Sequence, residues 1–223
     1  MPVTDRAVRR APLSRERILE TAVELCDTSG LGALTMRRLG EVLGVEAMSL
    51  YHYVEGKEDL LTGIVDVVLS KINLTPPANE WKLATRESAV SALEVLLEHP
   101  WSCGLVLSPD STQIVPARMR WIESILARFR SAGFSPTGAS RGYHAIDSHV
   151  LGFTLWELGH SPPSDAPPDY LEQILDTFDF TGYPYLAEHA HEHLRDVDGP
   201  AVGEFEFGLD LILDGLARMR TTA

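Results

Sequence analysis

Several polar side chains between positions 35 and 57 are of the kinds that bind nucleic acids. Arg37 can reach a guanine edge or a phosphate group, and Ser49 can hydrogen-bond to either. Tyr51 and His52 are suited to backbone phosphates. Lys57 stands where a new helix begins, and the free N–H groups at that end of a helix attract anions. These residue types and spacings indicate a surface that binds DNA.

Two short helices must position these side chains. The first has an apolar face made by Leu39, Val42 and Leu43. Gly44 follows, where a helix needs a residue that tolerates positive φ at its C-terminal cap. Glu46 then opens a second helix that carries Leu50 toward the core. Two helices joined by a short turn with glycine predict a helix-turn-helix, although a helical hairpin in a bundle is an alternative.

The outward face of the second helix has few hydrogen-bonding groups. Ala47 and Met48 can pack on a thymine methyl group but lack strong donors and acceptors. Base recognition is therefore expected to depend heavily on Arg37 and on apolar contacts. Tyr53, by contrast, is expected to pack against the preceding helices.

The run from Ser14 to Ile72 resembles the N-terminal domain of the TetR family of bacterial repressors. The matching elements are Ile18-Leu19-x-x-Ala22, Gly30-Leu31, Leu34-Thr35, Leu39, Leu43-Gly44-Val45, Leu50-Tyr51-x-Tyr53-Val54 and Lys57-x-x-Leu60-Leu61. In the family the matching positions contact DNA. The resemblance thus implies DNA contacts at Thr35, Arg37, Ala47, Met48, Ser49, Tyr51, His52 and Lys57.

The distribution of charge suits a DNA-binding head on an acidic body. The chain of 223 residues has a net charge of −13. Residues 1–54 hold seven arginines and seven acidic residues, so the rest of the chain carries the whole excess of negative charge. The acidic remainder would repel DNA and restrict contact to the head. The alternative is that the arginines are merely solvated.

The pattern along the chain predicts an all-α fold. Residues 1–13 are expected to form a flexible basic arm, residues 14–73 a three-helix helix-turn-helix domain, and residues 80–220 a larger helical bundle for ligand binding and dimerisation. Pro76-Pro77 marks the boundary. The helices expected after it cover about 81–98, 114–131, 137–159, 170–178, 184–195 and 202–220, with only a short apolar segment at 103–107.

The C-terminal part resembles the tetracycline-repressor type of body through Glu98-His99-Pro100-Trp101 and the run from Phe205 to Leu216. The resemblance implies that the helices near 137–159 and 202–220 pair with those of a second copy. It also implies an apolar pocket for a small molecule, for which the candidate residues are Trp101, Met119, Trp121, Ile122, Phe129, Phe153 and Trp156. A plain hydrophobic core would use the same residues.

Motifs for metal binding or catalysis are missing from the sequence. It holds no HExxH, CxxC, GxSxG or glycine-rich phosphate loop, so we expect neither an enzyme nor a cofactor. His189, His191 and His193 alternate at a spacing of two, which points them in different directions on a helix. A metal site with Glu188 or Glu192 is conceivable, but a solvated face is the better interpretation.

Localisation follows from what the sequence lacks. No apolar run approaches the ~20 residues of a membrane span. The N-terminus has no apolar secretory segment, so we expect a cytoplasmic protein. Cys26 and Cys103 are too few for a disulfide framework, and Cys26 is expected to be buried.

The sequence therefore favours a ligand-responsive transcriptional repressor. We expect it to bind a palindromic DNA operator as a homodimer and to be released by a small apolar or aromatic effector. The alternatives are a helical protein-interaction module and an enzyme with its active site in the C-terminal body.

Overall fold

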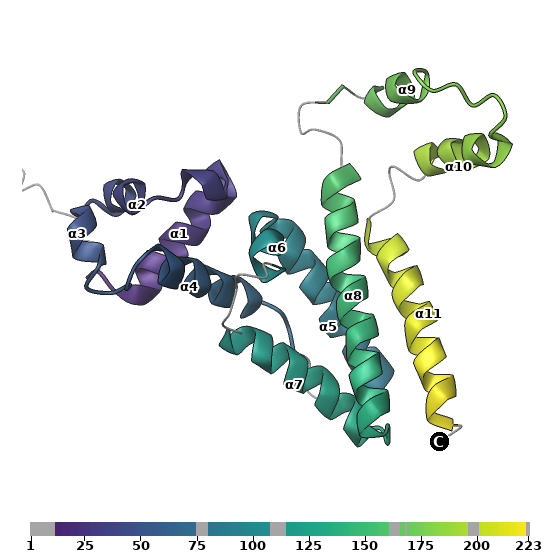
Figure 1. Ribbon diagram of the computed structural model, residues 1–223, viewed down its shortest axis with the longest axis horizontal. Helices are drawn as coiled ribbons and strands as arrows, with labels where there is room; N and C mark the ends of the chain where they lie inside the picture. The colour runs from purple at the N-terminus through teal and green to yellow at the C-terminus, as the bar shows by residue number, and fades with distance from the viewer. Residues whose placement is uncertain are drawn as a thin grey trace, which may run out of the picture. The chain divides into compact units, whose positions relative to one another are not determined.

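The computed structural model is built from helices (Figure 1). It describes residues 12–74, 80–107, 115–160, 166–167, 169–195 and 201–221. No strand occurs within these ranges, and the predicted all-α class is confirmed. None of the helices in the described ranges is long and apolar enough to cross a membrane.

The chain divides into two compact units that do not follow the order of the sequence. The first unit combines Met1–Lys71 with Glu98–Arg120, and the second combines Ile72–Leu97 with Trp121–Ala223. The sequence boundaries at 14–73 and 80–220 remain a prediction. Most of the expected basic arm lies outside the described residues.

The first unit is a cluster of short helices (Figure 1). Its elements are α1 (Arg15–Ser29), the 3-10 turn η1 (Leu31–Ala33), α2 (Met36–Leu43), α3 (Ala47–Leu50), α4 (Lys57–Leu69), α6 (Trp101–Val106) and the start of α7 (Pro116–Ser131). Helix α1 packs on both α2 and α4. Ser14 and Thr35 cap α1 and α2, since each hydroxyl accepts a hydrogen bond from the backbone N–H three residues later. Burying the apolar faces of α1, α2 and α4 stabilises the unit.

The connection between α2 and α3 is tight because two glycines allow it. Gly44 ends α2 in the left-handed conformation, with φ of 70°. Gly40 lies inside α2, where a Cβ atom would come within 2.9 Å of the Val45 carbonyl oxygen and 3.2 Å of the Ala47 nitrogen. Leu39 and Leu50 are fully buried below this turn. The expectation that Val42 shares the buried face was wrong, since its side chain is 49% exposed.

The second unit contains the longest helices of the described residues. It contains α5 (Trp81–Glu98) up to Leu97, α7 from Trp121 onward, α8 (Pro136–His160), α9 (Tyr170–Leu175), α10 (Pro184–Arg195) and α11 (Ala201–Thr221). Helices α8 and α11 lie side by side. His149 of α8 stacks on the ring of Phe205 and donates from Nε2 to its carbonyl oxygen over 2.9 Å. A second cluster joins the rings of Trp81, Phe129 and Phe134.

The predicted helices match the observed ones closely except where they are short. The segment expected only as an apolar stretch at 103–107 is α6, a helix that begins at Trp101. The turn η1 was not expected. Single turns of helix carry too few periodic residues to be detected from a pattern.

Replacing Gly40 with alanine tests the close approach of α2 and α3. The added methyl group would meet backbone atoms, which cannot rotate away, so we expect the free energy of unfolding to fall by about 1–3 kcal/mol. Urea unfolding followed by circular dichroism measures the change. Gly32→Ala is the control, because its Cβ would meet nothing within 4 Å. Equal stability of the two variants would contradict the packing described here.

Candidate nucleic-acid interface

The side chains predicted to contact DNA gather on the outward side of α2, α3 and the turn after α3. Those of Arg37 and Met48 are 89% and 74% exposed. The others are exposed or half-buried: Thr35, Ala47, Ser49, Tyr51, His52 and Lys57. The fold therefore brings all eight into one unit, on α2 with its N-cap, on α3 with the turn that follows it, and at the start of α4. Their contact with DNA remains a prediction.

Thr35 has a structural role that the sequence analysis did not assign. Its Oγ1 accepts a hydrogen bond from the Arg38 backbone nitrogen over 3.1 Å and so caps α2. Replacing such a cap typically costs about 1 kcal/mol. Any loss of DNA binding in a Thr35 variant would thus combine a lost contact with a weakened helix.

Arg37 and Arg38 share one carboxylate on the surface of α2. Arg37 donates from Nε to Glu41 over 3.1 Å, and Arg38 donates from an Nη atom to the other oxygen over 3.3 Å. These bonds, the one from Arg37 first, lower the pKa of Glu41. Arg38 was not among the predicted contacts, although it holds a second guanidinium beside the first. Glu41 therefore orients two cationic side chains, and a DNA phosphate could replace Glu41 as their partner.

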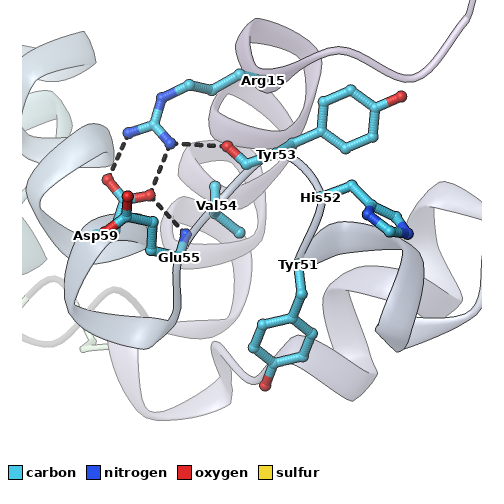
Figure 2. A pocket seen from close by; sticks show the side chains of 7 residues that line it. All are labelled: Arg15, Tyr51, His52, Tyr53, Val54, Glu55 and Asp59. Atoms are coloured by element: carbon cyan, nitrogen blue, oxygen red, sulfur yellow. Dashed lines mark hydrogen bonds and ion pairs between the residues drawn. The ribbon is translucent and has the colours of Figure 1, made fainter.

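A hollow of about 420 Å³ lies beside the turn that follows α3 (Figure 2). It is lined by Arg15, Tyr51, His52, Tyr53, Val54, Glu55 and Asp59. Tyr51 and His52 extend from the turn in different directions (Figure 2). Both come from a segment without regular structure, so their placement depends on what holds the turn.

Arg15 and Asp59 hold this turn in place. The Arg15 guanidinium donates two hydrogen bonds to the Asp59 carboxylate, over 2.7 and 2.6 Å, and one to the Tyr53 carbonyl oxygen over 2.9 Å. Asp59 also accepts from the Glu55 backbone nitrogen over 2.9 Å. We call these four residues the turn clamp. The clamp ties the first turn of α1 and the first turn of α4 to the segment that carries Tyr51 and His52.

The clamp changes the protonation equilibrium of its carboxylate. The hydrogen bond from Arg15 is the main cause that lowers the pKa of Asp59, and the bond from the Glu55 N–H adds to it. The same ion pair raises the pKa of Arg15. Asp59 was not among the residues singled out from the sequence. A pair separated by 44 residues leaves no periodic signal.

Tyr53 differs from its prediction. Its side chain is 39% exposed, so the expectation that the ring packs against the preceding helices was wrong. The backbone carbonyl of Tyr53, which Arg15 binds, makes the fixed contact instead. The ring extends away from the clamp in Figure 2.

Lys57 is the first residue of α4, and its side chain is exposed. No side chain caps the N-terminus of α4. The end of a helix with free N–H groups and an exposed ammonium group is able to hold a phosphate.

The residues predicted to bind a small molecule are divided between the units. Trp101 and Met119 lie in the first unit, where the Trp101 indole donates to Asp27 over 2.7 Å and Met119 is 52% exposed. In the second unit, Trp121 is buried and donates from its indole to Asp147 over 3.1 Å. Ile122 of α7 is half-buried. Trp101 and Trp121 therefore serve the packing of their own units.

Two further aromatic candidates belong to α8. Phe153 packs edge-on against Phe205 of α11, and Trp156 is 44% exposed and stacks on His160. Phe129 is fully buried in the aromatic cluster. The pocket assignment for all these residues remains a prediction.

A buried guanidinium in the second unit was missed altogether. Arg128 is 2% exposed, and its Nη2 donates to the Ser88 hydroxyl over 3.0 Å. Burial lowers the pKa of this group. In sequence it looks like one of several arginines on an amphipathic helix, so no signal distinguished it.

The histidines near the C-terminal end of α10 form no metal site in the part of the chain that is described. The residues that the structure describes contain no group of three or more His, Cys, Asp or Glu side chains that could hold a metal ion. His189 and His191 are exposed, and the side chain of His193 lies outside the described set.

Comparison with known proteins places this geometry in a family. The model of the bacterial regulatory proteins of the tetR family matches residues 18–64, and the model of the tetracyclin repressor-like C-terminal domain matches residues 75–220. The chain belongs to the TetR family. It is a ligand-responsive transcriptional regulator with a helix-turn-helix and not an enzyme.

Individual relatives agree with this assignment over nearly the whole chain. The transcriptional repressor DrrR1 of Streptomyces coeruleorubidus is 30% identical, with 96% of this chain and 82% of that protein covered. The apo structure of ActR from Streptomyces coelicolor superposes with a TM-score of 0.74 at 26% identity, covering 95% of this chain and 98% of ActR. ActR in complex with actinorhodin gives a TM-score of 0.74 at 27% identity, covering 94% of this chain and 99% of that one.

The turn clamp can be tested through stability. Replacing Asp59 with asparagine removes a bidentate but partly exposed ion pair, so we expect the free energy of unfolding near neutral pH to fall by about 1 kcal/mol. Because the folded-state pKa of Asp59 is lowered, this contribution is present above the ordinary value of 3.8 and is lost as pH falls through the folded-state value.

Urea unfolding of both proteins from neutral to acidic pH measures this difference. The two stabilities should converge in acid. Glu58→Gln is the matched control, since Glu58 is an exposed acid in the same first turn of α4. If the Glu58 variant were as unstable as the Asp59 variant, the loss of stability would come from removing a negative charge in the first turn of α4 and not from breaking the turn clamp.

Proposed function

We propose that this protein is a repressor that binds an operator through Arg37, the outward face of α3 and Lys57. The observation that carries this proposal is the exposure of these side chains on a helix-turn-helix whose following turn is held by the turn clamp. Arg37 and Ser49 would contact base edges or phosphates, and Met48 with Ala47 would pack on thymine methyl groups. Tyr51, His52 and Lys57 would bind the phosphate backbone, with Thr35 at the N-terminus of α2 beside them.

We propose that the active form is a homodimer. Helix α3 has four residues and can reach only a few base pairs, too few to define a genomic site. A two-fold dimer reads inverted half-sites, which makes the operator palindromic. Helices α8 and α11 expose large apolar side chains that a second copy would cover: Leu155, Trp156, Phe207, Leu211 and Met219.

We propose that an apolar or aromatic effector binds the C-terminal domain predicted at 80–220 and releases the DNA. The complex of ActR with actinorhodin supports a bound small molecule, because ActR resembles this chain over almost its full length. An effector that prefers a conformation unable to bind DNA shifts the population away from the operator. Because the proposed target is operator DNA, we propose that the protein acts in the cytoplasm. The proposed partners include neither a membrane nor a cofactor.

Salt dependence tests the proposed phosphate contacts. Replacing Arg37 or Lys57 with alanine should weaken operator binding and reduce the slope of log affinity against log salt by about one. A variant that makes one phosphate contact fewer releases fewer counterions when it binds DNA. Fluorescence anisotropy with DNA from the protein's own upstream region, across a salt series, measures both quantities.

Arg141→Ala is the charge-matched control, because Arg141 is an exposed cation of α8 in the other unit. Its slope should equal that of the unmodified protein. Unchanged slopes in both test variants would remove Arg37 and Lys57 from the interface.

Dimerisation is tested on α11. Phe207 is 66% exposed, so Phe207→Glu should leave the fold intact while raising the dimer dissociation constant by at least about tenfold, because it places a charge in an apolar interface. Sedimentation velocity across a concentration series measures this. Leu83→Glu, at a leucine of α5 that is 49% exposed, is the control. A Phe207 variant that dimerises like the control would exclude this face.

A further inference from the structure

A buried histidine in the first unit joins the ends of two helices. His99 is 1% exposed and lies between α5 and α6. Its Nδ1 lies 2.7 Å from an Oδ1 of Asp27, near the end of α1, and its Nε2 lies 2.7 Å from the Nζ of Lys71, just after α4. The Trp101 indole donates to the same Asp27 oxygen over 2.7 Å.

The partners of His99 determine where its proton lies. An ammonium group can only donate, so Nε2 must accept from Lys71. A carboxylate can only accept, so Nδ1 must donate to Asp27. The observed contacts therefore require the neutral imidazole with its proton on Nδ1.

Protonation would break one of these two bonds and spare the other. A second proton, on Nε2, turns that atom into a donor that faces the Lys71 ammonium at 2.7 Å, and two positive charges at this distance repel. The bond to Asp27 would survive, because Nδ1 still donates. The proton would thus release the end of α4 while the end of α1 stays attached.

The end of α4 matters for DNA binding because the same helix carries two parts of the interface at its start. Lys57 is its first residue, and Asp59 belongs to the turn clamp. We propose that neutral His99 is a positioning residue that fixes the far end of α4, and that DNA affinity falls when His99 is protonated. This inference rests on the proposed DNA binding of α2, α3 and Lys57.

Two charged groups are bonded to the imidazole of His99 in the described structure. They are Asp27 from α1 and Lys71 from the segment after α4. The thiols of Cys26 and Cys103 stay neutral in the range where imidazoles titrate, since burial raises the pKa of each to about 11. His52 is a second imidazole of this unit, but it lies on the proposed DNA surface, where a positive charge strengthens binding. A response of His52 therefore has the opposite sign.

The first test is made without DNA. Long-range proton–nitrogen NMR of the full protein, labelled at histidine, should show His99 at about pH 7.5 as the neutral Nδ1–H tautomer. Amide hydrogen exchange should show faster opening of residues 66–71 in the unmodified protein as pH is lowered. A proton on Nε2 or a charged ring near neutral pH would overturn the proposal.

The second test measures operator affinity by anisotropy between about pH 7.5 and 5.5, where an imidazole changes its charge. We expect the affinity of the unmodified protein to fall roughly tenfold, the size expected from one lost hydrogen bond to a charged group. His99→Gln keeps a group that can accept from Lys71 but cannot be protonated, so it should not show this fall. Lys71→Met should remove the fall as well.

His99→Asn separates the two bonds, because it retains a donor toward Asp27 and loses the acceptor for Lys71. It should bind weakly at both ends of the pH range, and circular dichroism shows whether it is folded. Equal pH dependence of the unmodified protein and His99→Gln would overturn the proposal. If no variant binds DNA, the proposed function fails, while the NMR and exchange measurements still decide the state of His99.

Discussion

Helix α3 has only four residues, and this length is the constraint on which the DNA-binding unit depends. A single turn of helix is not stable alone, because forming it fixes several residues for very few hydrogen bonds. Its orientation must therefore come from neighbours. Gly40 lets α2 approach closely, and Leu50 is buried beneath. The turn after α3 is then held by Arg15 and Asp59.

Helices α1 and α4 form the frame that supplies these neighbours, and polar contacts join them at both ends. At their starts Arg15 binds Asp59, and at their ends Asp27 and Lys71 meet across His99. Between these contacts the packing is apolar, and apolar contacts have no preferred direction. Hydrogen bonds, in contrast, are directional. The apolar core thus provides most of the stability, whereas the two polar contacts determine the relative positions of the helices.

The sequence predicts this frame only in part. The helix-turn-helix could be located because Gly44 and the apolar spacing are local signals. Val42 was placed wrongly because a helix as short as α2 has too few residues to define its buried face. Tyr53 was placed wrongly because it lies in the turn after α3, where no periodicity indicates which side chains are buried. Arg15 with Asp59, and Asp27 with His99, are distant in sequence and carry no periodicity. The role of Trp101 was missed for the same reason, since its indole serves Asp27.

Two arginine–carboxylate pairs in this unit have opposite properties. Arg37 is 89% exposed and its bond to Glu41 is a single contact on a helix surface, where ion pairs contribute little and are screened by salt. A phosphate can therefore replace Glu41 with little loss of free energy. Arg15 makes two bonds to Asp59 and a third to the backbone, so replacing any one of them leaves the others. The unit thus has one arginine whose carboxylate partner is easily exchanged and another that is fixed for the structure of the unit. In the proposed function, the first arginine binds DNA while the second preserves the geometry of the interface.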